Sequence, residues 1–158
     1  MNKLKLTLAV ISTMMLGACV SDTTKEVLEL QNSQEQMNQK ASQDLDNVKT
    51  LEANVTKFNS MADQLQVQAD AANKQVKQLS EAYAQFDNPD DNDAVAIRER
   101  NTQETQKAID LQKQVNKYRS QADEATAQSK QLKDEAYSDA NQSDELAKKI
   151  ATLQSTEK

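Results

Sequence analysis

Apolar residues recur every seven positions along most of this chain, in two long arms separated by a short polar segment. Within each arm the apolar positions alternate at spacings of three and four residues, which is the heptad pattern of a coiled coil. A strict seven-residue period over this length is typical of a left-handed supercoil. We therefore predict an all-α protein, with coiled-coil helices at residues 25–86 and 94–155.

The first arm carries the stronger apolar stripe. A Thr23-to-Glu26 pair has the spacing of a capping box and predicts the start of its helix. Among its eighteen seam positions only Gln34 and Asp44 are polar. The first row of this seam is Val27, Gln34, Ala41, Val48, Val55, Ala62, Ala69, Val76 and Tyr83; the second row is Leu30, Met37, Asp44, Leu51, Phe58, Leu65, Ala72, Leu79 and Phe86.

The second arm repeats the pattern in a shifted frame and is more polar. Its first row is Ala94, Asn101, Ala108, Val115, Ala122, Ser129, Ala136, Ser143 and Ile150; its second row is Ile97, Glu104, Leu111, Tyr118, Ala125, Leu132, Asp139, Leu146 and Leu153. The two arms are equally long. Each seam covers two positions in seven, too narrow a stripe to stabilise a lone helix in water. We therefore expect the arms to cover each other.

The polar segment 87–93 predicts how the arms meet. Its single proline, Pro89, fits a turn and would cost about 3 kcal/mol inside a helix. We therefore predict an antiparallel hairpin, in which Ala69 faces Leu111 and Ala62 faces Tyr118. The alternative is a continuous rod that forms a trimeric coiled coil. Either Asn88 or Asp93 is expected to cap the second helix.

Two sets of acidic residues are candidate functional groups. Asp44 and Asp139 are seam carboxylates that the hairpin brings into adjacent layers, where we expect them to fix the register. The acidic residues of the turn lack the glycine and terminal glutamate of an EF-hand loop, so we expect a solvated turn and no metal site. The chain contains no histidine and offers no nucleophile beside a base, so we predict neither an enzyme, nor a cofactor, nor a small-molecule substrate.

Composition and charge narrow the partners. The formal net charge is −6, which disfavours nucleic acid as a partner. Aromatic residues make up 3% of the chain and the one glycine is Gly17, so a compact globular core with many turns is not expected. A second copy of the chain, or another coiled-coil protein, remains a candidate partner.

The N-terminus has the parts of a secretory signal at residues 1–18. Lys3 and Lys5 precede an apolar run too short to span a bilayer. The run ends in Leu16-Gly17-Ala18-Cys19, which resembles the lipobox of bacterial lipoproteins. That resemblance implies cleavage between Ala18 and Cys19, and acylation of Cys19, for example with palmitate.

A lipid on Cys19 would anchor the mature chain to a membrane through a short linker, residues 19–24. In lipoproteins, an aspartate directly after the lipidated cysteine retains the protein in the inner membrane. Val20 and Ser21 stand there instead. The resemblance therefore implies an outer-membrane lipoprotein, more readily on the periplasmic face than on the cell surface.

The C-terminal tail, residues 156–158, ends in Lys158. Together with the lipobox and the alanine-rich heptads, this ending is similar in plan to the murein lipoprotein family, whose terminal lysine is joined to peptidoglycan. We predict a non-catalytic coiled-coil scaffold or interaction module of the cell envelope. Two alternatives are a tether between the outer membrane and peptidoglycan through Lys158, and a regulatory subunit that binds an envelope enzyme or channel.

Overall fold

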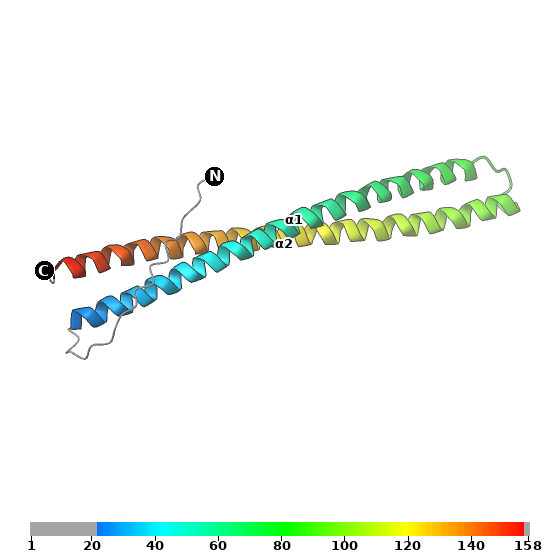
Figure 1. Cartoon of the computed structure of the whole chain (residues 1–158). Coiled ribbons are helices and arrows are strands. Elements are labelled where there is room, and N and C mark those ends of the chain that lie inside the picture. Colours follow the sequence, from blue (N-terminus) through cyan, green and yellow to red (C-terminus); the bar gives the residue numbers. More distant parts are fainter. Residues whose placement is uncertain (1–21, 157–158) are drawn as a thin grey trace.

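The computed structural model describes residues 22–156, which form two long helices folded into an antiparallel hairpin (Figure 1). Helix α1 spans Asp22–Tyr83 and α2 spans Asn92–Thr156. The start of α1 and the end of α2 lie at one end of the rod, here called the base, and the connecting turn lies at the tip (Figure 1). At 1.5 Å per residue each helix is about 95 Å long. The predicted all-α hairpin is confirmed, and the continuous rod is wrong.

The base of α1 differs slightly from the prediction. The helix begins at Asp22, inside the segment predicted as linker, so Thr23 is its second residue rather than a cap ahead of it. Asp22 places a carboxylate in the first helical turn, where the unpaired amides favour negative charge. Lys25 lies 3.9 Å from the same carboxylate. These interactions favour a start one turn earlier than the capping-box pattern predicted.

The tip end of α1 also differs from the prediction. The helix ends at Tyr83, three residues before the predicted end at Phe86. Beyond it, the Phe86 amide donates to the Tyr83 carbonyl at 3.2 Å, a bond that spans three residues instead of four. The chain thus tightens as it leaves the helix, as is common at helix C-termini. Phe86 itself remains half-buried.

Four hydrogen bonds build the turn at the tip and the start of α2. The Asp91 amide donates to the Asn88 carbonyl at 3.3 Å, which closes a turn with Pro89 at its second position. Asp91 then caps α2: its carboxylate accepts the Asp93 amide at 2.9 Å, and its carbonyl accepts the Val95 amide at 2.9 Å. The prediction that either Asn88 or Asp93 caps α2 is therefore wrong. Asn88 stabilises the turn instead, because its side chain accepts the Asp90 amide.

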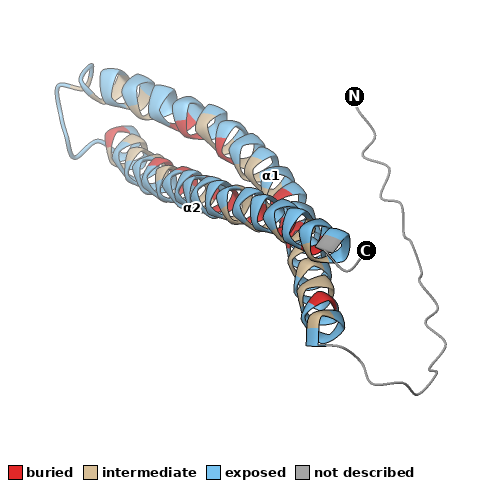
Figure 2. Ribbon diagram, turned by 90° about the vertical axis from the view of Figure 1, so that its left-hand side faces the viewer, coloured by how far each residue is buried: buried red, intermediate tan, exposed pale blue. Residues whose placement is uncertain are grey.

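The core is a single seam between the two helices. Residues of the first seam row are mostly buried in both helices, and they are mostly small (Figure 2). Val115 is the largest fully buried side chain among the described residues. The buried members of the first row are Val27, Ala41, Val48, Ala62, Ala69, Ala94, Ala108, Val115, Ala122, Ser129, Ala136, Ser143 and Ile150.

Larger side chains occupy the second row and stay half-buried. Of the second row only Asp44, Ala72, Leu111 and Ala125 are buried. Its remaining leucine, isoleucine, methionine, phenylalanine and tyrosine side chains are all partly exposed. A hairpin of two helices covers only a narrow stripe, so small residues lie on the contact line and large ones extend beside it. The rod therefore keeps part of its apolar surface in contact with solvent.

The two helices pair in the register that the sequence predicts. Ala69 and Leu111, expected to face each other, lie in one buried cluster with Ala72 and Ala108. The rings of Phe58 and Tyr118, from neighbouring layers, stack with centroids 6.1 Å apart. Each of the ion pairs between the helices joins residues nearly equidistant from the turn, as antiparallel pairing requires; they are Glu26–Lys149, Lys40–Asp139 and Glu52–Lys133.

Candidate functional site: a polar break in the seam

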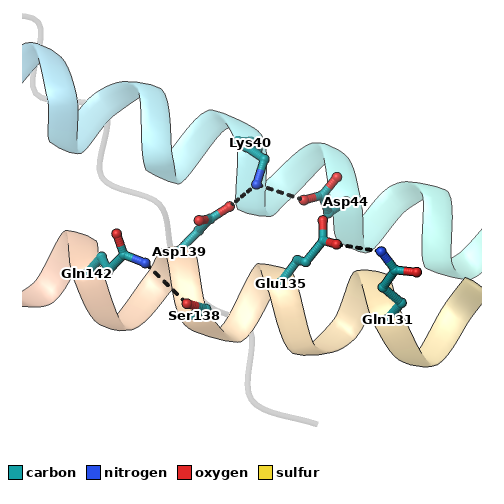
Figure 3. Close-up of polar contacts among 7 residues, drawn as sticks. All are labelled: Lys40, Asp44, Gln131, Glu135, Ser138, Asp139 and Gln142. Carbon is teal, nitrogen blue, oxygen red and sulfur yellow. Dashed lines mark hydrogen bonds and ion pairs between the residues drawn. The ribbon is translucent and has the colours of Figure 1, made fainter.

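Charged side chains from both helices interrupt the apolar seam in the half of the rod nearer the base, and Figure 3 shows their contacts. Lys40 of α1 reaches across to α2, where its Nζ donates to Asp139 Oδ2 at 2.6 Å. The same Nζ lies 3.9 Å from Asp44 Oδ2, one helical turn along α1. We call Lys40, Asp44 and Asp139 the polar break.

The two carboxylates are far less exposed than the lysine between them. The side chains of Asp44 and Asp139 are 12% and 15% exposed, whereas that of Lys40 is 57% exposed. Asp44 Oδ2 is buried and has no hydrogen bond. The ion pair with Lys40 Nζ at 3.9 Å is the contact that offsets the cost of burying this atom. A buried polar atom left in this way lowers stability. Asp44 is therefore the weak member of the break.

Lys40 is electrostatically coupled to α2. The hydrogen bond that Lys40 donates to Asp139 is the main reason that the pKa of the Lys40 ammonium lies above its ordinary value, and the nearby charges of Asp44 and Glu135 act in the same direction. Glu135, whose side chain extends from α2 toward α1, also accepts a hydrogen bond from Gln131 at 2.9 Å (Figure 3). The positive charge on Lys40 thus links the helices at this level.

The geometry supports the structural role predicted for the two aspartates. The cross-helix pair disfavours a shift of either helix, because a one-layer slip would separate Lys40 from Asp139 and leave the Asp139 carboxylate without its partner. Lys40 itself was missed in the sequence. Its spacing of four residues from Asp44 could have identified it, since oppositely charged side chains at that spacing meet on a helix.

The acidic turn does not gather its carboxylates around a common point. Asp91 is engaged with the Asp93 amide, and Asn88 holds the Asp90 amide. Throughout residues 22–156, no group of three or more histidine, cysteine, aspartate or glutamate side chains is placed to hold a metal ion. The contacts of this turn are those of a helix cap.

The remaining predicted sites, Ala18, Cys19 and Lys158, lie outside the described residues. Within the two helices that the structure describes, no stretch is long and apolar enough to cross a membrane. No family model, curated protein or solved structure matches this chain.

Proposed function

We propose that this chain is a non-catalytic lipoprotein of the cell envelope, anchored to the outer membrane through Cys19, whose hairpin acts as a scaffold or interaction module. The observation that supports this most directly is the position of the lipobox. Cys19 precedes the first residue of α1 by three residues, so a lipid there would attach the base of the rod to a membrane. At least two acyl chains are needed for stable anchoring.

The shape of the hairpin suits a spacer. Its two helices, of 62 and 65 residues, run alongside each other for about 95 Å. Because both chain ends of the described part lie at the base, the tip with its acidic turn is the part farthest from the anchor (Figure 1). A rod held in this way would present its sides and tip to partners while the base stays at the membrane.

The same geometry favours a scaffold over a tether to peptidoglycan. Lys158 follows the end of α2 by two residues, and α2 ends at the base. Two residues span at most about 7 Å. In the hairpin a terminal lysine would therefore lie at the same end of the rod as the lipid, whereas a tether needs its two attachment points at opposite ends.

Metabolic labelling tests the lipid anchor. Cells producing the full chain are given an alkyne fatty acid, and label incorporation is compared with that of Cys19→Ser. A matched control, Cys19→Ser with Ser21→Cys, returns a thiol two residues away from the lipobox position. We expect label in the parent chain and in neither variant. Label retained in Cys19→Ser would contradict the proposal.

Membrane fractionation tests the location. The parent chain should sediment with outer membranes, and Val20→Asp should move it to the inner membrane, since the lipoprotein resemblance gives that position the sorting role. Identical fractionation of both chains would overturn the outer-membrane assignment.

Mass spectrometry of muropeptides separates the scaffold from the tether. It compares the parent with Lys158→Arg, and a muropeptide carrying Lys158 would favour the tether.

A further inference from the structure

One side of the hairpin combines the half-buried second seam row with the positions that flank it. In a helix with this heptad pattern, the position before each first-row residue lies next to the second row. The contacts confirm that these positions of both helices share one side, because Phe58 stacks on Tyr118 and Glu26 pairs with Lys149 there. Glu52 and Lys133 each directly follow a second-row residue, a position that lies next to the first row, and they pair on the opposite side.

The middle of this side carries no charged residue. We call it the uncharged face and define it by sixteen positions: Asn47, Leu51, Asn54, Phe58, Met61, Leu65, Gln68, Ala72 and Gln75 of α1, with Leu111, Gln114, Tyr118, Gln121, Ala125, Gln128 and Leu132 of α2. Charged residues make up 28% of the whole chain. The face ends at Asp44 and Lys40 toward the base and at Glu104 and Lys107 toward the tip.

The uncharged face has the layout of a protein interface. Its centre is apolar and only half-buried, with the stacked Phe58–Tyr118 pair beside Met61 and Leu65. Asparagine and glutamine side chains surround this centre. Among them, Gln121 has a buried Oε1 atom without a hydrogen-bond partner. An aromatic centre within a polar rim is the usual arrangement of residues that contribute most to binding between proteins.

We propose that a second copy of this chain covers the uncharged face, so that two hairpins form a four-helix bundle. Each copy carries a net charge of −6, so two copies repel each other except where their contact surfaces are free of like charges. Amide side chains both donate and accept hydrogen bonds, so a rim of them is complementary to itself. A two-fold contact requires such self-complementarity, because it places the same surface on both partners.

The size of the face fits a stable dimer. It extends over 29 residues of α1, from Asn47 to Gln75, and over 22 residues of α2, from Leu111 to Leu132, which is about 42 Å and about 32 Å along the two helix axes. Two helices side by side are about 20 Å wide, so each copy would bury about 750 Å² and the pair about 1,500 Å². That is the area of a standard specific interface. The contact maps the face onto itself, so its aromatic centre meets the centre of the second copy.

Photo-crosslinking in cells tests this pairing with two adjacent positions. Gln68 lies on the uncharged face, and Val67, 70% exposed, points away from it. Each is replaced in turn by p-benzoyl-L-phenylalanine in the full chain. We expect a self-adduct of twice the chain mass with the label at Gln68, identified by mass spectrometry, and none at Val67. No adduct at Gln68, equal adducts at both positions, or an adduct with a different protein would overturn the proposal.

A charge placed within the face provides the second arm. Met61→Glu sets like charges against each other in the dimer, whereas Ser60→Glu adds the same charge at an exposed position seven residues before Val67, on the side of α1 away from the face. With the label at Gln68, we expect Met61→Glu to lower the self-adduct by roughly tenfold and Ser60→Glu to leave it unchanged, since like charges in a contact are strongly unfavourable. Circular dichroism of both variants should report the same helix content. An unchanged adduct in Met61→Glu would contradict the pairing.

Discussion

Replacing Asp44 with leucine should stabilise the hairpin. Asp44 occupies a second-row seam position that is buried to 8% exposure, and its Oδ2 atom has no hydrogen bond. Its removal leaves no charge without a partner, because Lys40 keeps its 2.6 Å bond to Asp139. Asp44→Leu therefore removes a poorly compensated carboxylate and returns an apolar residue to the stripe.

The magnitude follows from two opposing effects. Exchanging buried ionic groups for apolar residues stabilises proteins by about 1–4 kcal/mol. Leucine is larger than aspartate, and accommodating extra volume in a packed seam costs about 1–3 kcal/mol. The second row lies beside solvent, so the leucine side chain can extend outward. The cost of the extra volume therefore lies at the low end of that range. We expect a net gain of about 1–2 kcal/mol, or about 4–8 °C in Tm.

Thermal unfolding followed by circular dichroism at 222 nm measures this gain, with all chains at one concentration because pairing of copies would make Tm depend on concentration. Asp63→Leu is the matched control, since Asp63 is exposed and the same exchange there should change stability by less than about 0.5 kcal/mol. Asp44→Asn removes the charge without adding apolar volume and should fall between the parent and Asp44→Leu. A Tm for Asp44→Leu below that of the parent would refute the reasoning.

Three further predictions concern the cap, the core and the ion pair. Asp91→Ala should cost about 1 kcal/mol in urea unfolding through loss of the α2 cap, whereas Asp90→Ala, which removes an equal charge next to it, should cost much less; equal losses would contradict the cap assignment. Val115→Ala should cost about 2 kcal/mol because it opens space at a fully buried position, while Val67→Ala at the exposed surface should stay within about 0.5 kcal/mol. Lys40 has a raised pKa, so its contribution to stability is fully present below the unperturbed lysine pKa of about 10.4 and is lost as pH rises through the higher folded value. The parent should accordingly lose more Tm than Lys40→Gln between pH 9 and about pH 12, and parallel losses would show that the cross-helix bond does not stabilise the fold.

The heptad rows and the break at Pro89 were sufficient to predict the fold. Two equal apolar stripes, each too narrow to be stable alone, have few ways to be covered within one chain, and a proline between them favours the turn. Matching row to row then placed Ala69 opposite Leu111, and the two residues do share a buried cluster. Long-range order in this molecule is therefore encoded by a simple periodic pattern.

Local choices were harder to predict, because several residues of one chemical type compete for each role. Helix caps are commonly Asn or Asp, so Asn88, Asp91 and Asp93 are all suitable. Asp91 caps α2 because the turn that contains Pro89 ends at Asp91. The cross-helix partner of Lys40 depends on the exact register, which the spacing of Lys40 and Asp44 along one helix does not contain.

The heptad period alone also could not predict that the second row stays partly exposed. A heptad pattern identifies the stripe, but it does not say how each helix is rotated about its axis within the pair. That rotation buries Ala62 and Ala122 and leaves Phe58 and Tyr118 half-buried, which creates the uncharged face. The three-dimensional pairing was needed to find this surface.

A distance between two spin labels tests the hairpin most directly. Ser33 of α1 and Asp144 of α2 are exposed and lie at the same level near the base, so they suit labelling through introduced cysteines in a Cys19→Ser background. Dilution with unlabelled chain restricts the measurement to pairs within one molecule. With helix axes about 10 Å apart, the labels should lie about 10–25 Å from each other. In a continuous helix the same residues would be about 165 Å apart, so the absence of any short distance would contradict the hairpin.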